Sequence, residues 1–252
     1  REALRLMEID FPIEVTTFAD IPAGTGLGSS SSFAVGLMHA LYALKGQYVT
    51  KYTLAESAAQ IEINILKRTM GKQDHYAASY GNLNIFTFQP DESVVVEPVF
   101  YQMEVKNTLD DNLMLFYTKL KRDASEVLKT QNRAISKKRK VLQKMRDLVH
   151  PLKDVLSGKN NVNVFGEILH KNWMLKKSIT DQVSSAKIDV YYDKAIAAGA
   201  IGGKLLGAGG GGFLLFYVEK KNQNSVREVL SELYELKFEL DTDGTRITYY
   251  DQ

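Results

Sequence analysis

The chain has 252 residues, of which 44% are hydrophobic and 25% are charged, and these proportions are typical of a soluble globular protein. Its formal net charge of +2 gives no reason to expect a nucleic-acid partner. No stretch approaches the ~18 consecutive apolar residues of a membrane span, so no membrane partner is expected either. The absence of cysteine excludes disulfides, thiolate zinc sites and a cysteine nucleophile, and it fits the cytoplasmic location that we expect.

The first part of the chain is predicted to alternate between strands and helices. PIEVTTFA (12–19) alternates as a strand does and leads through a glycine loop into an almost wholly apolar helix. A second helix is expected to start at Thr53, where Thr53 and Glu56 have the spacing of a capping box. The short helix DHYAASY, closed by Gly81, precedes two predicted strands, NLNIFTF and SVVVEPV.

The second part is expected to be a helical insertion between strands. NLMLFYT (112–118) is a predicted strand, Asp123 caps the next helix, and Pro151 interrupts that helix. The basic run at 136–140 fits the solvated face of this helix. The remaining predicted elements are helices at 162–178 and 184–198, strands on both sides of 207–212, a helix at 224–234 and two strands within 235–250. We therefore expect one domain over 1–98 and a second over 99–252.

The loop PAGTGLGSSSS (22–32) directly precedes the apolar helix, and it carries three glycines and four serines. The free N–H groups and the positive dipole end of a helix N-terminus favour an anion. Glycines remove the side chains that would hold a phosphate away, while serines add hydroxyls, one to cap the helix and another to reach an anion or a metal. The loop therefore indicates a phosphate site, and an ordinary helix cap after a flexible turn is the alternative.

A second glycine run, GAGGGG at 207–212, has the letters of a dinucleotide-binding fingerprint. That fingerprint must open a helix, whereas the residues after 212 have the pattern of a strand, so this interpretation fails. A Walker P-loop fails as well, because neither glycine loop is followed by Lys-Ser or Lys-Thr. A tight turn where two backbones touch and a loop that lines a site both stay open.

Two carboxylates are candidates for chemistry. Glu62 projects from an apolar helix face and so requires a cation, a metal or hydrogen-bond donors; a buried structural salt bridge is the alternative. Asp74 is either the cap of a short helix or part of a site, and His75 adjoins it. If Ser29 or Ser30 converges with both carboxylates, the group suits magnesium, phosphates and a nucleophilic hydroxyl.

Three stretches together resemble the GHMP kinases, the superfamily of galactokinase, homoserine kinase, mevalonate kinase and phosphomevalonate kinase. PAGTGLGSSSS is similar to the phosphate-binding motif of this superfamily, and KLLGAGGGGF is similar to its C-terminal glycine motif. IEINILKRTMGKQDHYAASYGNLNIF and FYTKLKRDASEVLKTQ most resemble the bacterial D-glycero-D-manno-heptose 7-phosphate kinases within it. The resemblance implies an α+β, two-domain GHMP kinase fold, whose first domain is like domain 2 of ribosomal protein S5 and whose second is ferredoxin-like.

The resemblance also implies an ATP- and magnesium-dependent kinase that phosphorylates the anomeric hydroxyl of a sugar phosphate, with D-glycero-D-manno-heptose 7-phosphate as the expected substrate. Kinases of fucose or galactose stay open, as does a non-catalytic sensor that binds ATP and sugar. Asp74 is expected to be the catalytic base, Lys72 to act on transition-state charge or on phosphate, and Ser30 and Glu62 to bind magnesium. ATP is expected to contact Pro22, Gly24, Gly26, Leu27, Gly28, Ser29, Ser30, Ser31, Gly207, Gly209 and Gly210. The sugar phosphate is expected to contact Asp74, His75, Arg122, Lys204 and Gly209.

Surface salt bridges are the alternative for Lys72, Arg122 and Lys204. Among partners we expect a small-molecule sugar phosphate, and a homodimer stays open. Members of the superfamily begin with additional strands and a short N-terminal motif that helps to bind substrate. This chain starts shortly before the phosphate loop, so it is expected to lack that segment; whether it is a fragment of a longer protein or partner segments are absent stays open.

Overall fold

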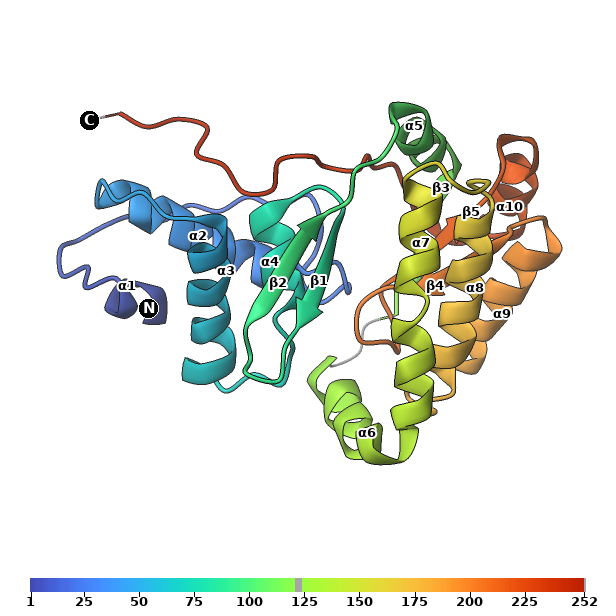
Figure 1. Ribbon diagram of the computed structural model, residues 1–252, viewed down its shortest axis with the longest axis horizontal. Coiled ribbons are helices and arrows are strands. Elements are labelled where there is room, and N and C mark those ends of the chain that lie inside the picture. Colours follow the sequence, from blue (N-terminus) through green and yellow to red (C-terminus); the bar gives the residue numbers. More distant parts are fainter. Residues whose placement is uncertain (121–123, 252) are drawn as a thin grey trace. The chain divides into compact units, whose positions relative to one another are not determined.

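The structure is a computed structural model, and it describes residues 1–120 and 124–251. The chain separates into two compact units, shown in Figure 1. Unit 1 comprises Arg1–Ala23, Gly28–Pro98 and the residues from Asp241 onward, and unit 2 comprises Gly24–Leu27 and Val99–Leu240. We predicted a second domain over 99–252, which includes the residues from Asp241 onward. In the structure these residues pack with unit 1. Asp123, the expected helix cap, and Arg122, an expected substrate contact, lie outside the described residues.

Unit 1 consists of helices and one hairpin. Its elements are α1 (Glu2–Leu6), α2 (Ser29–Leu44), α3 (Lys51–Ala59), the π-helix η1 (Gln60–Ile65), α4 (Gln73–Tyr80), β1 (Asn84–Phe88) and β2 (Val94–Pro98). The strands pair antiparallel, with Asn84 opposite Pro98. Gly81 ends α4 at φ 64°, a conformation that suits glycine. The predicted short helix and both strands of the hairpin are thus confirmed.

The core of unit 1 lies between α2, α3 and η1. Val35, Met38 and Leu41 of α2 are buried against Leu54 and Ala58 of α3. Burial of large apolar side chains at about 1.5–3 kcal/mol each stabilises this packing. The apolar character of α2 is therefore explained, because α3 and α4 both pack on it.

The predicted start of α3 at Thr53 is wrong. The helix begins at Lys51, and Thr50 is its N-cap, with the Thr50 hydroxyl accepting a hydrogen bond from the N–H of Thr53 at 3.1 Å. The threonine three residues earlier competes for the same capping role, since its side chain reaches an otherwise unpaired N–H. Glu56 is therefore not part of a capping box.

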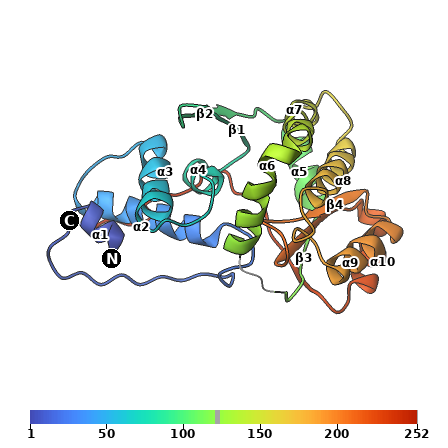
Figure 2. The same ribbon diagram turned by 90° about the horizontal axis from the view of Figure 1, so that it is seen from below.

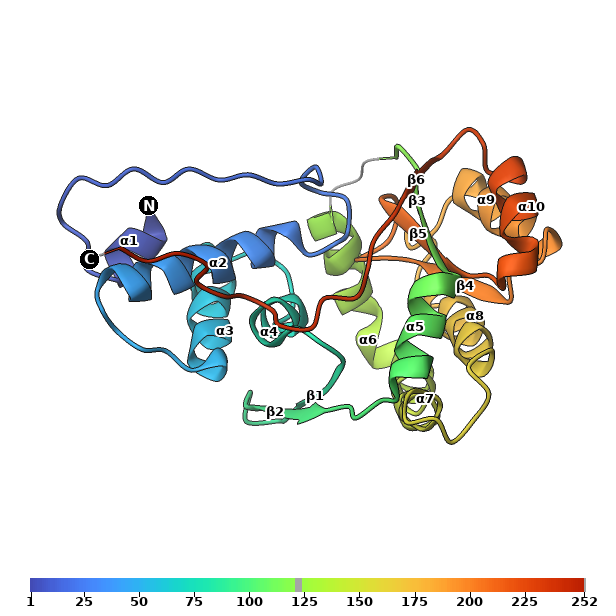
Figure 3. The ribbon, with the colours of Figure 1, turned by 90° about the horizontal axis from the view of Figure 1, so that it is seen from above.

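The predicted strand at 12–19 is also wrong. These residues form no strand ladder, and Phe18 is 94% exposed. A strand requires a hydrogen-bonded neighbour, and none of the described strands pairs with this segment. Figure 3 shows the segment running beside α2 towards the N-terminus of that helix.

The C-terminal segment is held on unit 1 by backbone hydrogen bonds rather than by a sheet. The N–H of Asn82 donates to the carbonyl of Asp241 at 3.0 Å, and the N–H of Thr245 donates to the carbonyl of Ala78 at 2.9 Å. Of the two strands expected within 235–250, the described residues contain one short strand at the start of that range. The second expected strand is absent from the described residues, because the hydrogen bonds of the C-terminal segment to unit 1 are isolated and form no strand ladder.

Unit 2 is a sheet covered by helices. Its elements are α5 (Met103–Asn112), β3 (Leu113–Tyr117), α6 (Ala124–Arg146), α7 (Val149–Leu156), α8 (Val164–Lys177), α9 (Ala186–Ala197), β4 (Gly202–Leu205), β5 (Phe213–Tyr217), the 3-10 helix η2 (Lys220–Asn222), α10 (Gln223–Val229) and β6 (Tyr234–Leu236). The antiparallel sheet has the order β4-β5-β3-β6. With helical crossovers from β3 to β4 and from β5 to β6, this is the ferredoxin-like arrangement that we predicted. Helix α5 was not predicted.

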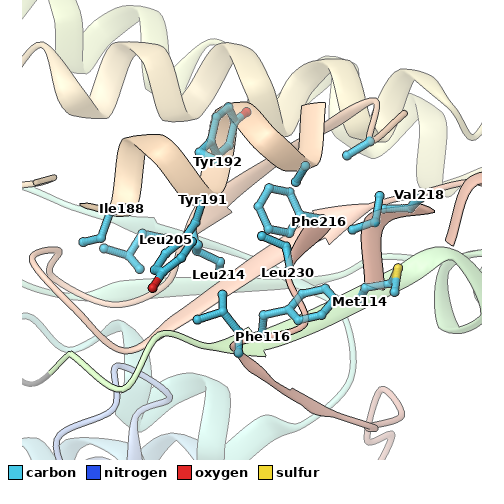
Figure 4. Packing of buried hydrophobic residues seen from close by; sticks show 14 of the residues in the cluster. Met114, Phe116, Ile188, Tyr191, Tyr192, Leu205, Leu214, Phe216, Val218 and Leu230 are labelled. Atoms are coloured by element: carbon cyan, nitrogen blue, oxygen red, sulfur yellow. The ribbon is translucent and has the colours of Figure 1, made fainter. Parts of the chain in front are cut away.

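The core of unit 2 lies between the sheet and helices α8, α9 and α10. Figure 4 shows Ile188, Tyr191 and Tyr192 of α9 packed over the strands that carry Phe116 and Phe216. Tyr192 and Phe216 have ring centroids 5.6 Å apart. Trp173 of α8 and Leu205 of β4 belong to this core, which therefore holds these two elements in place. No helix of the described residues has the length and apolar character to cross a membrane.

Strand β4 and helix α8 approach each other at two glycines, and Figure 2 shows the two elements side by side. A Cβ on Gly202 would lie 1.9 Å from the carbonyl oxygen of Gly166. We expect Gly202→Ala to lower the free energy of unfolding by about 3 kcal/mol or more, because the backbones must separate. Gly36→Ala is the control, since a Cβ on this helical glycine meets nothing within 4 Å and is expected to stabilise by about 0.5–1 kcal/mol. Chemical denaturation measures both, and equal stability of Gly202→Ala and the wild type would contradict the close packing.

Candidate active site

The N-terminus of α2 carries no side-chain cap. Gly28 is its N-cap in a left-handed conformation at φ 69°. The expectation that one of the serines caps it is therefore wrong, because the chain needs a glycine where it turns into the helix. Ser29 and Ser30 are half-buried in the first turn, and the Ser31 hydroxyl is buried without a hydrogen bond to another described residue. The uncapped first turn suits an anion.

Ser30 and Glu62 lie together beside this helix end. The Ser30 hydroxyl donates to Glu62 Oε1. The Arg68 guanidinium donates from Nη1 to Ser30 Oγ and to Glu62 Oε1, at 2.6 Å in each case. The sequence placed the first two residues in one site, and Arg68 adds a positive charge to it.

The second oxygen of Glu62 is held from inside the protein. His75 is fully buried, and its Nε2 lies 2.9 Å from Glu62 Oε2. Desolvation raises the pKa of Glu62, but hydrogen bonds from His75 and Ser30, together with the charges of His75 and Arg68, outweigh it and lower the pKa overall. Glu62 is therefore a carboxylate near neutral pH. A buried His75 serves to orient Glu62, and its predicted contact with substrate stays a prediction.

Asp74 also lies beside this helix end, next to Gly28. A Cβ on Gly28 would lie 3.4 Å from Asp74 Cβ and 3.5 Å from Asp74 Oδ2. Asp74 is an exposed residue, so its carboxylate is accessible to a ligand. Partial desolvation raises the pKa of Asp74; the charge of His75 lowers it, and that of Glu62 raises it further. A carboxylate thus lies beside the place where an anion would bind.

Lys72 has partners of its own. Its ammonium lies 3.0 Å from Glu56 and donates to the carbonyl of Glu92 at 3.0 Å. Tyr76 donates to the same Glu56 carboxylate at 2.5 Å. No described contact joins Lys72 to Ser30, Glu62 or Asp74, so its catalytic role stays a prediction.

A cavity of about 310 Å³ adjoins Ser30 and Glu62. This volume is at the lower end of the range for small-molecule sites. Its lining is mainly apolar, and Phe33, Leu37 and Leu66 contribute to it. Arg68 is a polar group at its wall. The cavity gives a ligand access to the oxygens of Ser30 and Glu62.

The two glycine motifs meet in unit 2. A Cβ on Gly207 would lie 2.6 Å from the Cα of Gly26, and one on Gly212 would lie 2.2 Å from the carbonyl oxygen of Thr25. The interpretation of 207–212 as a turn where two backbones touch is therefore confirmed. The alternative of a site-lining loop is compatible with it.

The remaining predicted contacts are distributed over both units. Gly209 and Gly210 lie against Val183, whose carbonyl accepts a hydrogen bond from the N–H of Gly210 at 2.9 Å. Gly24 and Leu27 group with unit 2, Pro22 groups with unit 1, and their ATP contacts stay predictions. Lys204 is half-buried on β4, where its ammonium donates to Asn172 Oδ1 at 3.2 Å.

Sequence analysis missed Arg68. Its separation of six residues from Glu62 does not match the three- or four-residue spacing of neighbours on an α-helix. The π-helix η1 changes this geometry, and the N–H of Arg68 donates to the carbonyl of Glu62 at 2.9 Å. A π-helix inside a helical run is frequent at functional sites. Its sequence, QIEINI, in which polar residues alternate with isoleucine, gives no local signal for a π-helix.

Family models and known proteins agree with this architecture. Residues 1–82 match the model for the GHMP kinases N-terminal domain, and residues 152–236 match the model for the GHMP kinases C-terminal domain. The D-glycero-alpha-D-manno-heptose 7-phosphate kinase of Campylobacter jejuni is 29% identical over 91% of this chain and 69% of its own length. The galactokinase of Pyrococcus furiosus is 26% identical over 87% of this chain and 68% of its own.

A solved structure supports the same assignment. The D-glycero-D-manno-heptose 1-phosphate kinase from Bacteroides thetaiotaomicron has a TM-score of 0.65 and 28% identity, over 94% of this chain and 68% of that one. Both family models, the ferredoxin-like sheet and the two glycine motifs thus agree. The chain belongs to the GHMP kinases.

Proposed function

We propose that the protein transfers the γ-phosphoryl group of ATP to the anomeric hydroxyl of a sugar phosphate, with D-glycero-D-manno-heptose 7-phosphate as the substrate. The observation that carries this proposal is the Asp74 carboxylate beside Gly28, at the uncapped N-terminus of α2. A phosphoryl acceptor needs a base close to the phosphate site, and this arrangement supplies one. The heptose phosphate kinases among the relatives favour the substrate. A location in the cytoplasm belongs to the same proposal.

The reaction assigns separate tasks to the residues of unit 1. The N–H groups of the first turn of α2 hold phosphate oxygens. The single proton of the Ser30 hydroxyl goes to Glu62, which leaves the Ser30 oxygen free to accept. Asp74 orients the sugar hydroxyl and accepts its proton while the new oxygen–phosphorus bond forms. The bond between the γ-phosphorus and the bridging oxygen breaks, ADP leaves, and the proton passes to solvent. His75 keeps Glu62 oriented towards Ser30.

Magnesium fits the oxygen atoms of Ser30 and Glu62. Magnesium takes one or two protein oxygens together with phosphates and water. The Glu62 carboxylate and the Ser30 hydroxyl already accept a positive group, Arg68. These two residues would hold the ion, which when bound neutralises phosphate charge.

Arg68 and a magnesium ion compete for the same Glu62 oxygen. We expect Arg68→Gln to lower, by about two- to fivefold, the magnesium concentration that gives half of the thermal stabilisation by an ATP analogue. The reason is that the ion pair of the half-exposed Arg68 with the buried Glu62 contributes roughly 0.5–1 kcal/mol. Thermal melting at increasing magnesium measures this. Arg246→Gln, which removes an exposed pair with Asp243 away from this cavity, is the control and should change nothing. A higher magnesium requirement in Arg68→Gln would show that Arg68 supports the metal site instead.

The substrate is tested by a panel of sugars. ADP release with magnesium-ATP is expected to be fastest with D-glycero-D-manno-heptose 7-phosphate and much slower with fucose and galactose. Faster turnover on fucose or galactose would show that this sugar, and not the heptose phosphate, is the substrate, while the type of reaction would stay as proposed. Binding of ATP and sugar without any turnover would favour a sensor on the same scaffold and overturn the proposal.

A further inference from the structure

Two lysines of unit 2 lie close together beside the glycine loop. Lys204 is on β4, and Lys176 is on α8, one helical turn after Asn172. Asn172 and Lys176 therefore share the face of α8 that packs on β4. The ammonium of Lys204 donates to Asn172 Oδ1 at 3.2 Å, and that of Lys176 donates to the carbonyl oxygen of Gly207. Both contacts are with neutral oxygen atoms.

The described residues provide no counter-charge for either lysine. No carboxylate among them forms an ion pair with Lys176 or Lys204, whereas the neighbouring Lys177 pairs with Asp189 at 3.1 Å. Both side chains are half-buried. Desolvation and the charge of Lys204 lower the pKa of Lys176 to about 7, and desolvation lowers the pKa of Lys204. Two like charges in this position are unfavourable, and an anion between them would remove the cost.

The loop beside these lysines offers further donors. In the backbone hydrogen bonds between described residues, the N–H groups of Gly207, Ala208 and Gly209 do not donate. Gly207 has no side chain, and it is exposed. Backbone N–H groups that stay free beside ammonium groups form the kind of environment that binds phosphate oxygens. The charges and the free donors thus favour the same class of ligand.

We propose that Lys176 and Lys204 form a binding subsite for a phosphate group beside Gly207. The identity of that phosphate rests on the proposed function, in which it belongs either to the sugar phosphate or to the nucleotide. The charge of the ligand neutralises both ammonium groups, and Asn172 holds Lys204 in place. Of these two lysines, the sequence indicated only Lys204 as a phosphate contact, and the structure adds Lys176 as a second cation beside it.

Direct binding tests the subsite without any turnover. The probe is inorganic phosphate against chloride at equal ionic strength and pH 7, followed by calorimetry and by NMR of isotope-labelled lysine side chains. In the wild type we expect phosphate to raise the pKa of Lys176. Lys176→Met and Lys204→Met are each expected to weaken phosphate binding about tenfold, because a charge-assisted contact is lost. Lys171→Met, an exposed lysine of α8, is the matched control.

These variants retain an apolar stem and remove an unpaired charge, so they are expected to fold and to melt no lower than the wild type. If phosphate leaves the pKa of Lys176 unchanged, and a double variant that combines Lys176→Met with Lys204→Met binds phosphate as the wild type does, the subsite is excluded. This result would leave the proposed kinase activity untouched.

Steady-state kinetics identify the source of the phosphate. A rise of about tenfold or more in the KM for the sugar phosphate, with the KM for ATP unchanged, assigns the subsite to the sugar phosphate. The reverse pattern assigns it to the nucleotide. Unchanged values of both KM in the double variant would overturn the proposal.

Discussion

Asp74→Asn is expected to reduce turnover by about 10²- to 10⁴-fold, the usual contribution of a positioned general base. The amide has the shape of the carboxylate, so the side chain keeps its place beside Gly28, but it cannot accept the proton of the sugar hydroxyl. Nucleotide affinity should stay nearly the same, because the proposed phosphate contacts are N–H groups in the first turn of α2, which the substitution leaves unchanged. Single-turnover kinetics and a nucleotide binding titration measure the two quantities separately.

The pH dependence gives a second test of Asp74. The carboxyl must be ionised to act as a base, so kcat/KM should rise with pH through the raised pKa of Asp74 and level off above it. This acid limb is expected above the value of about 3.9 for a free aspartate, and it should disappear in Asp74→Asn. Asp91→Asn is the control, because Asp91 only accepts hydrogen bonds from Ser93 in the hairpin turn. Wild-type turnover in Asp74→Asn would exclude Asp74 as the base.

Glu62→Gln is expected to reduce activity about a hundredfold or more at magnesium concentrations that saturate the wild type. A bound metal contributes several kcal/mol of charge stabilisation, and an amide at this position no longer attracts the ion. The variant also loses the charge that Arg68 and His75 contact, which lowers the free energy of unfolding by about 1–3 kcal/mol. Higher magnesium should restore part of the activity.

Glu56→Gln provides the matched control for Glu62. Glu56 lies in α3, which leads directly into η1, and its carboxylate contacts Lys72 and Tyr76. Its removal should affect stability and leave the magnesium dependence unchanged. The metal assignment is wrong if Glu62→Gln retains the magnesium dependence of the wild type, or if Glu56→Gln shifts it to the same extent.

Much of the fold was predictable from the sequence because its signals are local. Apolar runs such as NLMLFYT and the capping glycine at position 81 identify their elements directly. The strand predicted at 12–19 shows where local patterns fail, since alternation describes a side-chain pattern but not the presence of a pairing neighbour. The start of α3 failed for a related reason, because Thr50 and Thr53 carry equivalent capping side chains.

The candidate site was only partly predictable. Glu62 was identified because a carboxylate on an apolar helix face needs a partner, and the structure supplies Ser30, Arg68 and His75 as partners. Arg68 was not foreseen, because the π-helix that brings it there has no clear sequence signal. Lys176 was missed because only the packing of α8 on β4 places it near Lys204. Pairings of this kind depend on tertiary structure.

The most direct test of the account follows the phosphoryl group itself. Phosphorus NMR of the protein with magnesium-ATP and D-glycero-D-manno-heptose 7-phosphate should show ADP and an anomeric sugar phosphate appearing in equal amounts. Neither signal should appear at a comparable rate with Asp74→Asn. ADP without a sugar 1-phosphate, or no transfer to this sugar by a folded protein that binds ATP, would contradict the proposed reaction.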